Sequence, residues 1–154
     1  LLIYATWAAL VGLLGKGPWW LLATMALVWV ADIAAYFSGR AWGRRKLAPA
    51  ISPGKTWEGV AGAAVGVTLY GAAVSWALGA AQAASVAALL GGFGFLLVLL
   101  ALSIVGDLFE SLIKRQAGVK DSGRLLPGHG GVLDRIDSQL STLPVVALAL
   151  HARL

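Results

Sequence analysis

The chain of 154 residues contains no cysteine, only one methionine and only two histidines. The absence of cysteine excludes thiol nucleophiles, disulfides and thiolate metal ligands. Charged residues are also scarce, at 12% of the chain against 59% hydrophobic residues. In such an apolar chain, charged side chains are costly to retain, so a place where they gather is a candidate functional site.

Long apolar runs dominate the rest of the sequence. Trp57 to Ala80 and Ala83 to Gly106 each contain 24 residues, and at ~1.5 Å per residue each can cross a hydrocarbon core of ~30 Å. A third run extends from Pro18 to Ser38, and two shorter ones cover Leu1 to Leu14 and Ser138 to Leu150. The pattern predicts an all-α, polytopic transmembrane bundle of about five helices in a single membrane domain, residues 1–154.

The N-terminus has neither an initiating methionine nor the cationic lead-in of a signal peptide, because Leu1 already lies in an apolar run. We therefore expect the chain to be an N-terminally truncated fragment of a longer protein.

The net charge of +5 comes from cations in two polar segments, five between Gly39 and Lys55 and five between Lys114 and Arg135. A helical hairpin that turns near residues 79–82 would bring both segments to one side of the membrane. By the positive-inside rule, this predicts cytoplasmic loops at 39–56 and 107–137. Setting this topology would by itself explain the cations, and nucleic acid binding has no support without interleaved exposed aromatics.

Four carboxylates at predicted helix ends suggest a cation site: Asp107, Asp121, Asp134 and Asp137. A set of oxygen ligands favours Mg²⁺ or a similar hard cation. Asp134 and Asp137 are three residues apart in the first turns of the last predicted helix, and Asp107 could complete their site. The alternative is favourable charge at a helix N-terminus, with ion pairs to Lys120 and Arg135.

Five cations share this segment with glycine-bearing turns: Lys114, Arg115, Lys120, Arg124 and Arg135. The turns GVKDSG and PGHGG expose backbone N–H groups, which suit phosphate oxygens. Acids that bind metal beside cations that bind phosphate indicate phosphoryl or nucleotidyl transfer. His129 could donate a proton or a hydrogen bond there, or serve as a structural partner.

A second polar cluster, RAWGRRKLAPAISPGKTWEG, links two apolar runs. Its SPGKT lacks the first glycine of a Walker phosphate loop, so an ATPase is rejected. Ser52, Lys55 and Thr56 could form an anion site at the next helix start, or Ser52 or Thr56 could simply cap that helix. Asp32, inside an apolar run, is either functional or the partner of a neighbouring helix. Gly62 and Gly66 predict close helix packing, and such faces are compatible with a homodimer.

The charged segment resembles the signature of the CTP:phosphatidate cytidylyltransferases, also called CDP-diacylglycerol synthases. The matching residues are Ser111, Lys114, Arg115, Lys120, Asp121, Gly123, Pro127, His129, Gly130, Gly131, Asp134, Arg135 and Asp137. The upstream blocks ADIAAYFSGR, LAPAISPGKTWEG and GDLFES also look like blocks of the family in the right order. The resemblance extends from Ala31 to Leu154, whereas residues 1–30 match only as generic apolar helices.

The resemblance implies a multi-pass enzyme, in the inner membrane if bacterial, with its active site facing the cytoplasm. The implied reaction converts CTP and phosphatidic acid to CDP-diacylglycerol and pyrophosphate, with one or two Mg²⁺ ions as the cofactor. Phosphatidate phosphate is charged at neutral pH and needs mainly relief from repulsion by the triphosphate. The family normally has additional N-terminal helices, so we expect the longer parent protein to be the working enzyme.

Roles follow from the residue chemistry and the resemblance together. The expected metal ligands are Asp107, Asp134 and Asp137. The expected catalytic and phosphate-binding residues are Lys114, Arg115, Lys120, Asp121, His129 and Arg135. The resemblance adds Ser52, Lys55, Thr56 and Ser111 as substrate-binding residues, and it implies that the first three line the same cytoplasmic cavity.

Two rival functions remain at this point. The CDP-alcohol phosphotransferases also act on CDP-lipids, but their DG…AR…G…D…D pattern is absent, and Asp134 and Asp137 are three rather than four residues apart. A transporter or channel is supported only by Asp32 and the glycine-rich helices. Transport sites lie near the membrane midplane, whereas these charges gather at one face.

Overall fold

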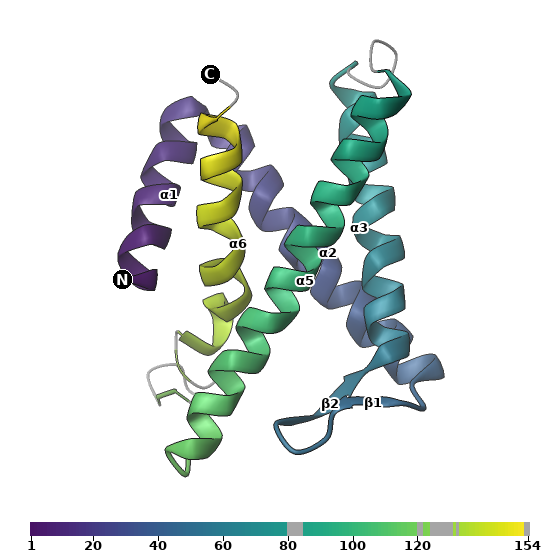
Figure 1. Cartoon of the computed structure of the whole chain (residues 1–154), viewed down its shortest axis with the longest axis vertical. Coiled ribbons are helices and arrows are strands. Elements are labelled where there is room, and N and C mark those ends of the chain that lie inside the picture. Colours follow the sequence, from purple (N-terminus) through teal and green to yellow (C-terminus); the bar gives the residue numbers. More distant parts are fainter. Residues whose placement is uncertain (80–84, 120–121, 124–130, 132, 153–154) are drawn as a thin grey trace.

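The computed structural model describes residues 1–79, 85–119, 122–123, 131 and 133–152, with the side chain of Arg135 excepted. This part of the chain forms five α-helices and one two-stranded antiparallel β-hairpin (Figure 1). The helices are α1 (Leu2–Lys16), α2 (Pro18–Trp42), α3 (Trp57–Ala77), α5 (Val86–Gln116) and α6 (Leu133–His151). The strands are β1 (Lys46–Ala48) and β2 (Ser52–Thr56). The predicted all-α bundle is therefore confirmed, with a small hairpin added.

Three of the helices, α2, α3 and α5, are long and apolar enough to cross a membrane. The two shorter apolar segments of the sequence also form helices, α1 with 15 residues and α6 with 19. Many large apolar side chains of the bundle point outward, among them Trp29, Phe37 and Leu69. An exposed apolar surface of this kind suits lipid tails rather than water.

The helices of the bundle pack against one another in several pairs. α2 packs along α3, while α6 packs against both α1 and α5. Figure 1 shows the β-hairpin, the end of α5 and the start of α6 at the same end of the molecule. The described parts of both polar segments therefore lie at one end of the bundle, and their cytoplasmic side stays a prediction.

Two helices end later than the apolar runs from which they were predicted. α2 continues to Trp42, and α5 continues past Gly106 to Gln116. Hydropathy marks where an apolar run ends, but the sequence DLFESLIKRQ is rich in good helix formers and extends the helix beyond it. Asp107 therefore lies ~2.5 turns before the end of α5 instead of in a loop. α5 ends at Gln116, and Gly118, two residues later, has a positive φ of 70° that turns the chain away from the helix.

The second polar segment is also more ordered than a loop. β1 and β2 pair with Lys46 opposite Thr56 and Ala48 opposite Ser52. Strands this short, one of them containing Pro53 and Gly54, carry no readable alternation, which explains why the hairpin was not predicted. Thr56 ends the hairpin and caps α3, because its Oγ1 accepts a hydrogen bond from the Gly59 N–H at 3.1 Å. The capping interpretation is confirmed for Thr56.

The glycines of α3 allow close contact with α2, as predicted. A Cβ added at Gly62 would overlap the Ser38 side chain, and one added at Gly66 would lie 2.8 Å from the Ala34 Cβ. Close approach of two helices at small residues is the usual source of packing energy in membranes.

We therefore expect Gly62→Ala to destabilise the bundle by ~1–3 kcal/mol, the usual cost of overpacking. Gly91→Ala in α5 is the matched control, since a Cβ there meets nothing within 4 Å. Thermal unfolding in detergent should show a lower midpoint for Gly62→Ala only. Equal midpoints would mean that the α2–α3 contact tolerates the added methyl group.

Candidate active site

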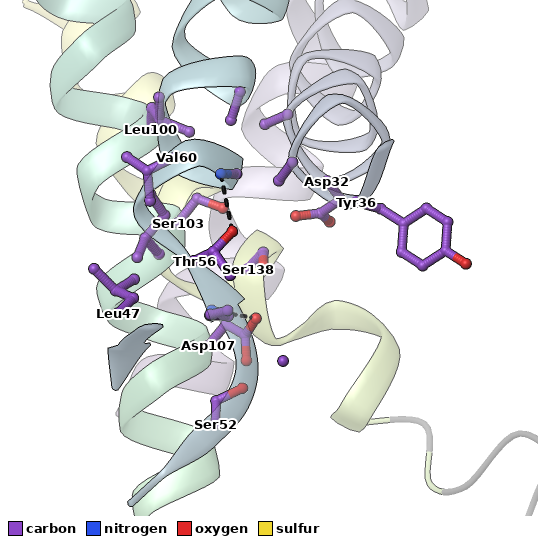
Figure 2. Close-up of a pocket in the computed structure, with 17 residues that line it drawn as sticks. Asp32, Tyr36, Leu47, Ser52, Thr56, Val60, Leu100, Ser103, Asp107 and Ser138 are labelled. Atoms are coloured by element: carbon purple, nitrogen blue, oxygen red, sulfur yellow. Dashed lines mark hydrogen bonds and ion pairs between the residues drawn. The ribbon is translucent and has the colours of Figure 1, made fainter. Parts of the chain in front are cut away.

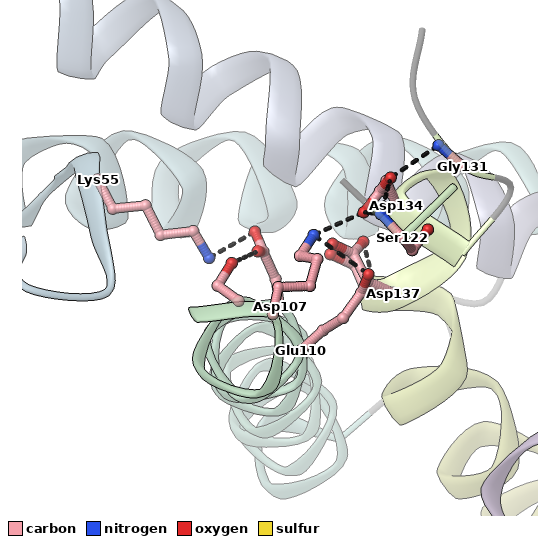
Figure 3. A network of polar contacts seen from close by, with 10 residues as sticks. Lys55, Asp107, Glu110, Ser122, Gly131, Asp134 and Asp137 are labelled. Carbon is pink, nitrogen blue, oxygen red and sulfur yellow. Dashed lines mark hydrogen bonds and ion pairs between the residues drawn. The ribbon is translucent and has the colours of Figure 1, made fainter. Parts of the chain in front are cut away.

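The polar end of α5 is the framework of the candidate site. Residues four apart lie on the same helical face. The Ser111 Oγ accordingly donates a hydrogen bond to Asp107 Oδ1 at 3.4 Å, and Lys114 Nζ lies 3.2 Å from Glu110 Oε1. α5 thus presents two acid-containing pairs, one toward the hairpin and one toward α6 (Figure 3).

The hairpin reaches α5 through Lys55. Its Nζ lies 2.5 Å from Asp107 Oδ2, and the two side chains are 25% and 28% exposed. The Lys55 side chain leaves β2 and reaches toward α5 (Figure 3), and the β1–β2 pairing and the Thr56 cap fix its backbone. Two residues that the sequence assigned to different functions, metal binding and substrate binding, are therefore in direct contact.

A cavity of about 450 Å³ lies beside this ion pair (Figure 2). Its polar wall contains Asp32, Ser52, Lys55, Thr56, Ser103, Asp107 and Ser138. Its remaining wall is largely apolar, with Ala31, Ala35, Ala63, Leu100 and Ile104. The volume falls within the ~300–1,000 Å³ typical of small-molecule sites. The prediction that Ser52, Lys55 and Thr56 share one cavity agrees with this geometry, and Asp107 joins them.

Asp134, at the start of α6, binds the Lys114 ammonium from α5 at 2.6 Å (Figure 3). It also accepts the Ser122 N–H at 2.9 Å and the Gly131 N–H at 2.8 Å. Partial burial raises the pKa of Asp134, but these hydrogen bonds outweigh it and hold the pKa well below its usual range. Asp134 is therefore an ionised carboxylate that joins two helices and two loop positions.

Gly131 is required for this arrangement. A Cβ at this position would overlap the Ser122 side chain and come within 2.7 Å of the Gly123 N. Only glycine lets the chain before α6 lie against residues 122 and 123, so the sequence spacing of the segment serves a close backbone contact.

Asp137 lies one turn further along α6. Its Oδ1 accepts the Ser138 N–H at 2.6 Å. Burial raises the pKa of Asp137, and the nearby Asp107 carboxylate raises it further. α6 can come this close to α5 because Gly106 has no Cβ; an added Cβ would overlap the Ser141 side chain. Asp107 and Asp137 thus belong to one electrostatic cluster.

The structure separates the remaining predicted residues. Arg115 points to the hairpin turn, where its Nε donates to the Ile51 carbonyl at 3.4 Å. The backbone of Arg135 belongs to α6, but its side chain is not described. Lys120, Asp121 and His129 lie outside the described residues, so their predicted roles stay predictions.

The predicted metal ligands are carboxylates at the α5–α6 junction. Within the described ranges, no group of three or more acidic or histidine side chains is close enough to hold a metal. Asp107 and Asp134 each face a lysine ammonium instead, at 2.5 and 2.6 Å. The carboxylate oxygens at this junction are nevertheless the ligand type that Mg²⁺ prefers, and the metal prediction stays a prediction.

The site contains two acids, Asp32 and Glu110, that were not among the predicted site residues. Asp32 of α2 lines the cavity with Asp107, and the sequence had already marked it as an intramembrane carboxylate. Glu110 shares Lys114 with Asp134. Its signal in the sequence is the spacing of four residues from Lys114, which becomes visible only once α5 is known to continue past Gly106.

The sequence matches the model of a family described as the cytidylyltransferase family over residues 1–152. The chain is 52% identical over 132 residues to a phosphatidate cytidylyltransferase of Pseudomonas aeruginosa, covering 86% of this chain and 47% of the relative. A protein of the same name from Brucella melitensis is 53% identical over 127 residues, covering 80% and 43%. A third, from Haemophilus influenzae, is 48% identical over 128 residues, covering 83% and 44%.

The chain therefore spans about half the length of these curated relatives. The match nevertheless includes nearly every residue of the helices and of the candidate site. On the length and the extent of this match, the chain belongs to the cytidylyltransferase family.

Proposed function

We propose that this chain carries the reaction centre of a phosphatidate cytidylyltransferase. The reaction transfers CMP from CTP to phosphatidic acid and yields CDP-diacylglycerol and pyrophosphate. The observation that carries the proposal is the meeting of Lys55 with Asp107 and of Lys114 with Asp134 at one end of an apolar helix bundle. The names of the relatives support it independently.

The chemistry needs charge control more than proton removal. A phosphate oxygen of phosphatidic acid attacks the α-phosphorus of CTP, and the bond from that phosphorus to the bridging oxygen of the β-phosphate breaks. Pyrophosphate leaves with the bonding electrons. With its second pKa near ~6, the attacking phosphate is already anionic at neutral pH, so no strong base is required. The main barrier is repulsion between the two anions.

Lysine ammonium groups can lower this repulsion from two directions. Lys55 enters from the hairpin and Lys114 from α5, and each is held by a carboxylate. Holding the cations in place before the substrates arrive reduces the reorganisation that the reaction would otherwise require. Arg115, Lys120 and Arg135 are proposed as further phosphate contacts, with Asp121 and His129 orienting them or the nucleotide.

Asp107, Asp134 and Asp137 are the residues that would hold Mg²⁺. A bound Mg²⁺ would supply additional neutralisation of the phosphate charge. The Asp107 carboxylate raises the pKa of Asp137, which indicates that the two carboxylates repel each other. A shared cation would remove this repulsion, which supports the choice of ligands.

The cavity suits one lipid and one water-soluble substrate. Its apolar wall lies within the membrane-crossing helices, whereas Ser52, Lys55 and Thr56 enter from the hairpin at their polar end. A headgroup can thus reach the polar wall while its acyl chains stay in lipid. The excess of cations at this end supports an orientation toward the cytoplasm, in the inner membrane of a bacterial cell. A homodimer is part of the same proposal, through helix faces other than that of Gly62 and Gly66, which α2 occupies.

The test is incorporation of labelled CTP into extractable lipid by the full-length protein that contains these residues. We expect product only when both phosphatidic acid and Mg²⁺ are added. A folded protein that forms no lipid product would overturn the proposal. Solute uptake by proteoliposomes without CTP consumption would instead support a transporter.

A further inference from the structure

The cluster at the junction of α5 and α6 contains one acid with no assigned function. Glu110 lies one helical turn before Lys114, and its Oε1 is 3.2 Å from the Lys114 Nζ. The same ammonium lies 2.6 Å from Asp134 Oδ1. Lys114 thus bridges an acid of its own helix and an acid of the next. Figure 3 labels these two acids, Glu110 and Asp134.

All three side chains are shielded from solvent. Lys114 is 16% exposed, Glu110 11% and Asp134 14%. Neither Glu110 oxygen accepts a hydrogen bond of good geometry from any described residue. The Lys114 ammonium is therefore the cation that Glu110 faces in the described structure. A shielded carboxylate is costly, so an acid at this position needs a compensating function.

We propose that Glu110 is a positioning residue, which holds the Lys114 ammonium at the α5–α6 junction for a phosphate group of the substrates. This inference rests on the proposed function. Glu110 does not touch the substrate in this proposal and acts only through Lys114.

The physical reason is the freedom of a lysine side chain. Its four-carbon stem has several rotatable bonds, and holding the ammonium in one place costs rotamer entropy. Asp134 alone would hold Lys114 from a different helix, so the ammonium would follow every displacement of α6. A second acid on α5 itself fixes the ammonium relative to its own backbone. The ordering cost is then met before substrate binds.

An ordinary helix-stabilising pair explains these observations less well. Exposed Glu–Lys pairs four residues apart contribute little to the stability of a helix. The Glu110–Lys114 pair is shielded, and its cation is shared with Asp134. A purely helical role would not require that third group.

The direct test measures how tightly Lys114 is held, without any substrate. The full-length protein is treated with an amine-acylating reagent, and the labelling rate of each lysine is followed by mass spectrometry. Glu110→Gln keeps the size of the side chain and removes its charge. We expect it to increase the labelling rate of Lys114 by ~5- to 10-fold, because one fixed ion-pair partner is lost. Lys46, exposed on β1, is the internal control and should not change.

The functional test uses a double-mutant cycle. Glu110→Gln should raise the KM for CTP or for phosphatidic acid by ~10-fold with a smaller change in kcat, and Glu110→Asp should restore part of the loss. In a Lys114→Met background, Glu110→Gln should have no further effect, since the group through which it acts is gone. Thermal unfolding midpoints identify variants that merely fail to fold.

The outcomes separate the two proposals. Absence of lipid product from the unsubstituted protein overturns the proposed function, whereas the labelling experiment still measures the hold of Glu110 on Lys114. An unchanged labelling rate overturns the positioning role. The same loss of activity in both lysine backgrounds also overturns it, because Glu110 would then act independently of Lys114.

Discussion

Asp134→Asn is expected to lower turnover by at least ~100-fold while the protein still inserts into the membrane. The substitution removes the charge that holds Lys114 at 2.6 Å and replaces one acceptor oxygen by an N–H₂ donor. The new donor would face the Ser122 or Gly131 N–H, which now donate to this carboxylate. Loss of one positioned electrostatic group typically lowers the rate by ~10²–10³-fold, and a hundredfold corresponds to ~2.7 kcal/mol of activation free energy.

The measurement is labelled CTP incorporation into lipid at saturating substrate, with gel filtration in detergent as the check on folding. Glu58→Gln is the matched control, because Glu58 also lies in the first turn of a helix but accepts hydrogen bonds from the Arg45 backbone N–H. Its activity should stay within about twofold of the unsubstituted protein, as is usual for surface changes. Near-normal turnover of Asp134→Asn would remove Asp134 from the reaction centre and from the metal site.

Lys55→Met should be nearly as damaging, with kcat/KM reduced by ~100-fold, while stability changes little. The ammonium is the hairpin's contact with Asp107 and is part of the cavity wall. Both side chains are about a quarter exposed, so solvent screening keeps the contribution of this pair to stability small. A positioned cation at developing phosphate charge is worth far more to the reaction, typically ~10²–10³-fold.

Lys46→Met separates a local role of Lys55 from a general effect of hairpin charge. Lys46 lies on the paired strand β1 opposite Thr56, and its side chain is exposed. We expect it to retain nearly full activity in the same CTP incorporation assay. Lys55→Arg should recover only part of the activity, because the planar guanidinium differs in shape from an ammonium. Equal losses in Lys46→Met and Lys55→Met would mean that the hairpin acts through its net charge.

Local features of the fold could be predicted from the sequence. Apolar runs of membrane length identified α2, α3 and α5, since helix formation in lipid depends on the segment's own backbone hydrogen bonds. Thr56 was one of two predicted caps, and Gly62 and Gly66 were predicted contact positions. Each of these properties depends on residues within a turn or two along the chain.

The helix ends and the hairpin were less predictable. The apolar run ends at Gly106, but α5 does not, because the mixed polar and apolar segment from Asp107 to Gln116 is rich in good helix formers. The pairing of β1 with β2 depends on contacts across a turn, and strands this short have no apolar–polar alternation from which the pairing could be predicted. Glu110 was overlooked for the first reason, since its relation to Lys114 requires a continuous helix.

The sequence by itself determined that this chain is an apolar helix bundle with its acids and cations gathered at one end, and its signature segment resembled one enzyme family. Only the tertiary structure decided which acid meets which cation. Lys55 reaches Asp107 because the hairpin folds back onto α5, and Lys114 meets Asp134 because Gly106 lets α6 pack closely against α5. Partners so far apart along the chain are chosen by helix packing, which local spacing does not specify.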